Sequence, residues 1–445
     1  MRLNLIRRAT GLLLAIAAAA PGTAAAQNLQ ELYDAARSFD ATILAARANA
    51  QSAEFRVAQV EALGRPAVTL SATVGNAQRD TPATDRRSTT SASGQVNGRY
   101  PLFNRSNEAT IEQARRSLAS AQADLDTAEQ DLLVRLSLAY FDVLAAQDTV
   151  ATTRASLSAI TEQLASARRN FEVGTATITD TREAQARFDL ATAQELAADN
   201  DLRAKRIGLD QLVGRTGVQP RPLLVPVVLP SGLGAPGSVE EWVTLADQQH
   251  PNVRRARVAL EVAQLETTKA RAGRLPTVDA VASVSGRDDR GSAFRNTNLA
   301  GRTVEGQVGV QMAWSLYSGG AVQARIQETQ LLEERSRNDL EAARRNIAQT
   351  TRVAFFNVLS GQAQVKALEA AESSSKLALE ATQLGYRVGV RVNLDVLNAQ
   401  TQLFNAQQAL ARARYDVLLG GLRLRQAAGQ LAPTDILAVN RLLAP

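Results

Sequence analysis

The stretch from residue 107 to residue 172 contains neither proline nor glycine. Apolar and alanine positions recur along it at steps of three and four residues, which is the seam of a coiled coil with one extra step of four. At about 1.5 Å per residue, such a helix is roughly 100 Å long. No single globular core requires a rod of that length. The pattern therefore predicts long helices that build a wall, each followed by a return helix.

The chain also repeats itself at an offset of about 215 residues. Ala-Tyr-Phe-Asp-Val-Leu at 139–144 returns as Ala-Phe-Phe-Asn-Val-Leu at 354–359, and Phe-Glu-Val-Gly at 171–174 returns as Tyr-Arg-Val-Gly at 386–389. Each copy reads as a helix, two strands, a very long helix and a return helix. The predicted organisation is a signal peptide, a first repeat, a Pro/Gly-rich linker, a second repeat and a C-terminal tail, at 1–26, 27–215, 216–238, 239–430 and 431–445.

The first 26 residues have the pattern of a secretory signal, with a basic start, a short apolar core and a small-residue cleavage site. An N-terminal membrane anchor is the alternative, but an apolar run of about ten residues is too short to span a bilayer. Loss of three arginines and no acid would lower the formal net charge from +6 to +3. The remaining charges are interspersed, so no nucleic-acid partner is expected.

Alternation with a period of two marks four strands. Val68, Leu70, Ala72 and Val74 alternate with small polar residues, and the pattern recurs near 96–102, 276–286 and 304–317. Polar stretches at 75–92 and 287–303 are expected to be loops. Four strands cannot close a membrane barrel, and an open edge is not tolerated in lipid. Strands pooled from three chains would give a barrel of twelve, so the pattern predicts a homotrimer in contact with membrane lipid.

Four aromatic residues fall at matching ends of the strands, next to the long helices: Tyr100, Phe103, Trp314 and Tyr317. Membrane barrels carry such residues as a girdle at the lipid–water interface. Ordinary aromatic packing in a core is the alternative. The repeated placement favours the girdle.

The residue inventory argues against catalysis. Cysteine is absent, and His250 is the only histidine. We interpret His250 as a surface turn residue before a helix. No metal site, cofactor or Gly-rich phosphate loop is expected. A secreted hydrolase is another alternative, but the chain lacks a histidine for a catalytic triad, and its carboxylates lie mainly on helix faces. A non-pore periplasmic coiled-coil adaptor is the stronger alternative, although it would not explain the amphipathic strands.

These features together resemble the outer-membrane efflux protein family across essentially the whole chain after residue 26. The resemblance rests on the duplicated unit, the Ala-Tyr-Phe-Asp-Val-Leu element with its copy, and the segments 170–180 and 385–400. It implies a mostly α fold with a small β part: a trimeric outer-membrane β-barrel with four strands per chain, continued by a long periplasmic α-helical barrel. It also implies a periplasmic adaptor (membrane fusion) protein and an inner-membrane ABC or RND-type pump as partners. The cargo would be proteins, through type I secretion, or drugs and other small molecules.

The resemblance further implies that the two tips between helices form a periplasmic gate. The matching positions are Thr179 and Asp180 on the first tip, with Tyr386 and Arg391 on the second donating hydrogen bonds toward them or nearby backbone. Asp395 matches an acidic position at the tunnel constriction, where three copies would form a ring that favours cations. Asn398 stands where the family pattern has a second aspartate, so a less negative mouth is expected. Plain helix N-capping is the alternative for both aspartates.

Overall fold

The computed structural model describes residues 27–81, 84–224, 237–291 and 301–444. The expected signal peptide at 1–26 and residues 225–236 of the expected linker lie outside the described residues. None of the helices in the described ranges combines the length and apolarity that crossing a bilayer requires.

The same order of elements occurs twice along the chain. The first series is α1 Leu29–Phe39, α2 Ala41–Glu61, β1 Ala67–Thr81, β2 Thr84–Phe103, α3 Arg105–Glu172 and α4 Ile178–Val213. The second is α5 Val239–Gln249, α6 Pro251–Ala272, β3 Thr277–Arg290, β4 Gly301–Ala313, α7 Ala321–Arg387 and α8 Asn393–Ala427. A last helix, α9 Pro433–Asn440, follows. The fold is thus mostly helical, with a small β part and an internal duplication.

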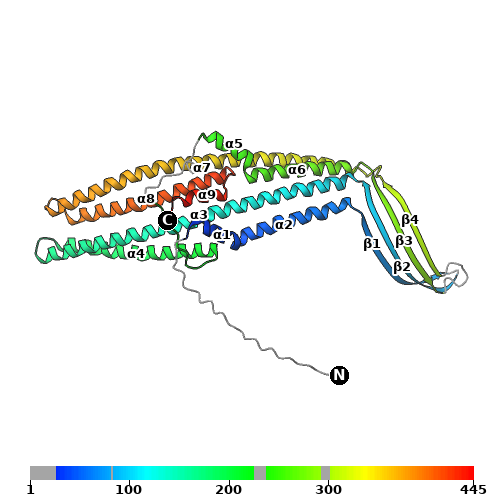
Figure 1. Cartoon of the computed structure of the whole chain (residues 1–445), viewed down its shortest axis with the longest axis horizontal. Coiled ribbons are helices and arrows are strands. Elements are labelled where there is room, and N and C mark those ends of the chain that lie inside the picture. Colours follow the sequence, from blue (N-terminus) through cyan, green and yellow to red (C-terminus); the bar gives the residue numbers. More distant parts are fainter. Residues whose placement is uncertain (1–26, 82–83, 225–236, 292–300, 445) are drawn as a thin grey trace, which may run out of the picture.

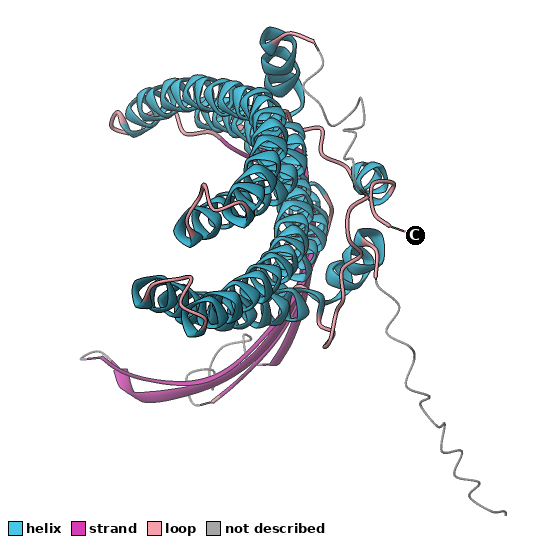
Figure 2. Ribbon diagram, turned by 90° about the vertical axis from the view of Figure 1, so that its left-hand side faces the viewer, coloured by secondary structure: helices cyan, strands magenta, loops and turns pink. Residues whose placement is uncertain are grey.

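The long helices α3 and α7, of 68 and 67 residues, run the length of a curved wall. Two shorter helices lie end to end beside each long helix. Beside α3, α2 continues the line of α4, and beside α7, α6 continues the line of α8 (Figure 1). Seen along the long axis, the helices form a curved wall with an open concave side. The shortest helices, α1, α5 and α9, lie on its convex side (Figure 2). The predicted wall of long helices is therefore confirmed.

The main hydrophobic core lies at the level where these helix ends meet. Side chains from α1, α3, α4, α8 and α9 are buried there together, among them Leu29, Leu136, Tyr140, Leu209 and Leu418. Burying each large apolar side chain stabilises the fold by roughly 1.5–3 kcal/mol. The C-terminal residues 431–445, expected as a tail, contribute α9 and a bridge between Leu223 and Leu443 to this region.

Two local expectations were wrong. The first helix of the repeat, expected as one element, is broken at Asp40, whose side chain accepts a hydrogen bond from the Ile43 backbone N–H and so starts α2. His250 occupies the equivalent place before α6 and is 8% exposed, so it is not a surface residue. Its Nδ1 accepts from the Asn252 backbone N–H at 3.1 Å. Burial lowers the His250 pKa, which keeps that nitrogen free to accept.

The four strands form one antiparallel sheet in the order β1-β2-β3-β4. The strands are longer than the apolar alternation indicated: the ladder between β1 and β2 continues from Ala67 opposite Arg99 to Thr81 opposite Thr84. The expected loop at 75–92 is therefore mostly strand. Backbone hydrogen bonds sustain the ladder even where the side chains are not apolar. The apolar alternation therefore underestimated the length of these strands.

Candidate channel surfaces

The sheet has one apolar and one polar face. Residues directly opposite each other in an antiparallel ladder point to the same face. The register places Leu70 opposite Val96, and Val96 opposite Val284. Apart from the register shifts near Thr81 and Phe103, even-numbered residues of all four strands therefore share one face. This face carries Val68, Leu70, Val74, Val96, Val284, Val304, Val308, Val310 and Met312.

The apolar face, called the outward face below, is exposed in the single chain. Val68 is 72% exposed and Val308 is 86% exposed. The odd-numbered face carries Thr69, Ser71, Gln95, Asn97, Ser283, Ser285, Gln307 and Gln311. On that face Arg99 of β2 pairs with Asp279 of β3 at 2.7 Å, and Asp279 is buried. A contiguous exposed apolar surface of this kind marks a site of contact with lipid or with another protein.

The four aromatic residues lie where the sheet meets the helices. Tyr100 and Phe103 belong to β2, whereas β4 ends at Ala313, so Trp314 and Tyr317 lie in the connection to α7. All four side chains are exposed, with Tyr317 at 88%, which differs from packing in a core. The Trp314 Nε1 donates to the Arg274 carbonyl oxygen at 3.1 Å and leaves the ring at the surface. Their role as a girdle stays a prediction.

The two tips at the other end of the wall are built by the same turn. In the first, the backbone N–H groups of Thr175 and Ala176 donate to the Asn170 carbonyl oxygen at 2.8 and 3.1 Å. In the second, the N–H groups of 390 and 391 donate to the carbonyl oxygen of residue 385 at 2.9 and 3.2 Å. Each turn needs a residue with positive φ, supplied by glycine at 174 (79°) and 389 (78°).

The first tip shows the capping that the sequence left as an alternative. Thr177 and Asp180 form a capping box, in which the Asp180 N–H donates to Thr177 Oγ1 at 3.2 Å and the Thr177 N–H donates to Asp180 Oδ2 at 2.9 Å. Thr179 lies exposed in the first turn of α4. Asp180 therefore starts α4, a role that is compatible with a second one at the mouth.

The second tip makes different contacts from those expected. The Tyr386 hydroxyl accepts from Asn170 Nδ2 at 3.1 Å, and the Arg391 guanidinium lies 3.6 Å from the Asp395 carboxylate. Within the described part of one chain, neither side chain bonds to Thr179 or Asp180. The structure thus brings Tyr386 close to the first tip, but through Asn170. The assignment of these residues to a gate stays a prediction.

Sequence reasoning missed two further hydrogen bonds between the helical hairpin α3–α4 and the helical hairpin α7–α8. Arg187 of α4 donates from Nη2 to Asn398 Oδ1 at 3.0 Å, so Asn398 has a cationic neighbour from the first repeat. Gln163 of α3 donates from its Nε2 to Asn393 Oδ1, and Asn393 is 3% exposed. Nothing in the sequence indicates which faces of α4 and α8 meet. Polar residues at these positions look like solvated helix surface.

The repeated Ala-Tyr-Phe-Asp-Val-Leu element lies in the core where the helix ends meet. The Tyr140 hydroxyl donates to the Arg221 carbonyl oxygen at 3.0 Å and so fastens the chain that leaves α4. Phe141 stacks on Tyr415 of α8, with ring centroids 5.8 Å apart. This element therefore holds the two repeats together, and its sequence similarity reflects packing.

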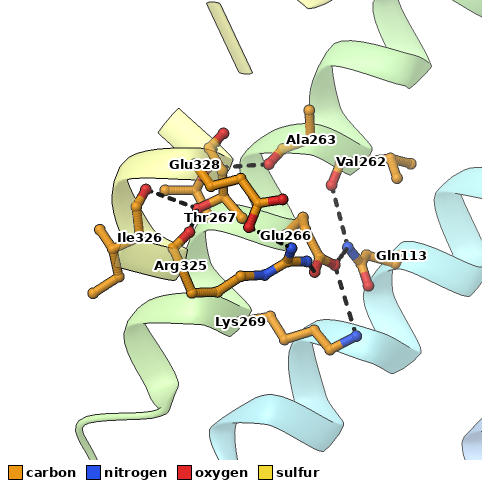
Figure 3. Close-up of polar contacts among 10 residues, drawn as sticks. Gln113, Val262, Ala263, Glu266, Thr267, Lys269, Arg325, Ile326 and Glu328 are labelled. Carbon is orange, nitrogen blue, oxygen red and sulfur yellow. Dashed lines mark hydrogen bonds and ion pairs between the residues drawn. The ribbon is translucent and has the colours of Figure 1, made fainter. Parts of the chain in front are cut away.

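A polar network joins three helices just below the sheet (Figure 3). Glu266 of α6 accepts from Gln113 Nε2 of α3 at 2.8 Å and from Arg325 Nη2 of α7 at 2.7 Å. These hydrogen bonds, from Gln113 foremost and from Arg325, lower the Glu266 pKa. The adjacent Thr267 is buried and donates toward the Thr329 carbonyl oxygen at 3.3 Å. The network fixes the helices from which the strands emerge.

Comparison with known proteins identifies the chain. The family described as "Outer membrane efflux protein" matches residues 32–215 and 242–430. The outer membrane protein TolC of Vibrio cholerae is 31% identical over 421 residues, which cover 93% of each chain. The alkaline protease secretion protein AprF of Pseudomonas aeruginosa is 36% identical over 313 residues, which cover 69% of this chain and 63% of that protein.

The fold is likewise that of a solved channel. The outer membrane protein VceC of Vibrio cholerae superposes with a TM-score of 0.77 at 19% identity, over 90% of this chain and 96% of that one. Nothing in these comparisons supports the alternative of a periplasmic adaptor, and the family consists of efflux channels, not enzymes. The chain belongs to the outer membrane efflux protein family and is an outer-membrane export channel that extends into the periplasm.

Proposed function

We propose that three copies of this chain form one channel, with a twelve-stranded barrel in the outer membrane and a helical tunnel in the periplasm. The two-faced sheet carries this proposal. Among the described strands, β1 pairs only with β2 and β4 only with β3, so both outer edges lack partners in one chain. Unpaired edges are costly in lipid and are removed when neighbouring copies complete the ladder.

The helical wall supports the same assembly. In the half of the wall remote from the sheet, the helices lie side by side in the order α4, α3, α8 and α7. Helices α4 and α7 therefore form the two margins of this half. Exposed apolar side chains occur on both: Leu196 and Ile207 on α4, and Leu377 and Leu384 on α7. Contacts between one margin and the opposite margin of the next copy are heterologous and close into a ring.

The tips would form the gate of this tunnel. Thr179 and Asp180 of the first tip and Tyr386 and Arg391 of the second lie at the end of the wall remote from the sheet. Asp395 and Asn398 follow one turn further in, where three symmetry-related copies would constrict the tunnel. The 3.6 Å contact between Arg391 and Asp395 then ties the gate to the carboxylate ring.

The channel would work with a periplasmic adaptor (membrane fusion) protein and an inner-membrane ABC or RND-type pump. AprF is named for the secretion of alkaline protease, and another relative, TtgC of Pseudomonas putida, is named for a toluene efflux pump. We therefore propose proteins or small molecules as cargo, driven by the pump. Because the pump supplies the energy, the channel itself would need no cofactor.

The direct test is purification of the full-length protein from outer membranes. The expected result is a detergent-extracted trimer that dissociates on heating and conducts ions in a planar lipid bilayer. A stable, monomeric protein that stays in solution without detergent would overturn the proposal. A trimer that forms but does not conduct would overturn the tunnel while leaving the assembly intact.

A further inference from the structure

The outward face of the sheet changes character near its free end. Even-numbered residues remain apolar or small from Met312 to Val304 on β4 and from Ala280 to Gly286 on β3. The next even-numbered positions are Asp288, Arg290 and Arg302, and Asp288 lies directly opposite Arg302 in the ladder. Two arginines and one aspartate thus emerge on the apolar side of the sheet, immediately beyond its apolar band.

The charges of this group do not cancel. Arg290 donates to Asp288 from Nη2 at 2.7 Å and from Nε at 3.3 Å, and its side chain is 79% exposed. Arg302 is exposed, and no described residue forms an ion pair with it. The group of Asp288, Arg290 and Arg302 therefore carries one excess positive charge. On the opposite face Arg287 is matched by Asp289 at 2.6 Å.

The height of the group fits the headgroup region of a membrane. Ten residues separate Met312, beside the aromatic end of the sheet, from Arg302, which corresponds to about 33 Å along a strand. With the tilt of about 40° that barrel strands adopt, the rise is about 25 Å. This equals the height of the apolar band of a membrane barrel, about 25 Å. Arg290 and Arg302 then lie at the lipid–water boundary farther from the periplasm.

We propose that Arg290 and Arg302 bind phosphate groups of the lipid in the outer leaflet, an inference that rests on the proposed membrane channel. A guanidinium group presents paired N–H donors that match two phosphate oxygens, and it keeps its charge at all physiological pH values. Asp288 accepts from Nε and Nη2 of Arg290, which orients the guanidinium and turns its Nη1 side away from that carboxylate, toward a phosphate group. Arg302 supplies the uncompensated charge. A ring of three such pairs would fasten the barrel to a phosphorylated glycolipid.

The test uses the full-length trimer in detergent, titrated with bisphosphorylated lipid A or with the same lipid after removal of its phosphates. Bound lipid is counted by native mass spectrometry. The wild type is expected to prefer the phosphorylated lipid. Arg302→Gln should weaken that binding about fivefold and the Arg290→Gln/Arg302→Gln pair roughly 25-fold, as expected for about 1 kcal/mol per arginine near an anionic surface.

Arg287→Gln is the matched control, because it removes the same charge from β3 on the other face. It should leave lipid binding unchanged, and Arg302→Lys should restore part of the loss. Equal binding of the two lipids would overturn the proposal, as would equal losses in Arg287→Gln and Arg302→Gln, or full competition by inorganic phosphate at concentrations near that of the lipid. Conductance of the same samples distinguishes failure of the lipid site from failure of the channel. Trimers that conduct but show no preference for the phosphorylated lipid overturn only the lipid site. Absence of trimers overturns the proposed channel as well.

Discussion

The Tyr415 hydroxyl on α8 donates a 2.6 Å hydrogen bond to the Asp148 carboxylate on α3, and so joins the second repeat to the first inside the protein. Burial raises the pKa of the Asp148 carboxyl above its ordinary value of 3.8. Burial and the bond to this carboxylate also raise the Tyr415 pKa. The pair thus holds a costly charge at the junction of the repeats, where one donor offsets its desolvation.

Replacement of that donor should destabilise the protein. Tyr415→Phe keeps the stack on Phe141 but leaves the Asp148 carboxylate without its partner, at a cost of about 1–3 kcal/mol. The measurement is the midpoint of thermal unfolding at pH 7. Asp148→Asn is the control: it keeps an acceptor for Tyr415 and removes the buried charge, so it should be at least as stable as the wild type. Because the folded pKa of Asp148 is raised, that advantage should shrink as the pH falls through the raised pKa and should be gone below the ordinary value of 3.8. Equal losses in both variants would contradict this account.

The network around Glu266 should make stability depend on pH in the opposite sense. A lowered carboxyl pKa in the folded state stabilises the protein above its ordinary value of 4.5 and ceases to do so as the pH falls through the lowered value. Glu266→Gln should therefore be less stable than the wild type at pH 7 and should lose the difference in strong acid. Glu328→Gln, which removes only an exposed partner of Arg325, should change stability by less than about 1 kcal/mol. A constant difference across the pH range would exclude the proposed role of the Glu266 charge.

The two faces of β4 provide a matched pair for the membrane assignment. Val308→Arg places a charge on the outward face and should cost roughly 2–4 kcal/mol, whereas Gln307→Arg on the polar face should be tolerated. The readout is the yield of heat-dissociable trimers in the outer membrane. Equal yields of the two variants would show that the apolar face does not contact lipid.

Reversal of charge at the second tip should loosen the mouth. Arg391→Glu places a carboxylate next to Asp395, 3.6 Å from the present guanidinium position, and the two like charges repel. The expected result is a several-fold rise in open time or conductance of single channels. Glu172→Gln, at an exposed position of the first tip, is the control and should leave both unchanged. Unaltered conductance in Arg391→Glu would remove this residue from the gate.

The contact between Arg187 and Asn398 predicts an interaction between two substitutions. Asn398→Asp alone should increase block by a trivalent cation only slightly, because Arg187, at 3.0 Å, neutralises the new carboxylate. Arg187→Gln/Asn398→Asp should bind the cation more tightly than either single variant, as a ring of free carboxylates would. Additive effects in bilayer recordings of cation block would show that the two side chains do not interact in the open tunnel.

Much of the fold could be predicted from the sequence because its physical signals are long. The stretch without proline or glycine from 107 to 172 matches α3 to within two residues at its start and ends at the same residue. The alternation at Val68–Val74 correctly located the apolar face of the sheet. The same alternation underestimated β1 and β2, since their outer parts are held by backbone bonds with polar side chains on both faces.

The tips show where sequence reasoning reaches its limit. Each turn was recognisable from its glycine, yet the contact of Tyr386 with Asn170 depends on how the two hairpins lie across from each other. That arrangement is set by packing between the helices of the two repeats, where Leu397 of α8 is buried among side chains of α3 and α4. His250 was misjudged for the same reason: a lone histidine before proline looks like a surface turn until α8 covers it. In the structure, residue 429 at the end of α8 lies against the His250 backbone.

Because α4 ends against Phe39 and α8 ends against His250, the wall has two breaks at one level, while α3 and α7 pass that level without interruption. Movement of α4 against α2, and of α8 against α6, would therefore be taken up at these two joints, whereas α3 and α7 would have to bend. Next to the sheet, the hydrogen bonds of Glu266 to α3 and α7 would hold these helices, and the strands that adjoin them, in place. A movement at the tips would thus reach the strands only through bending of α3 and α7.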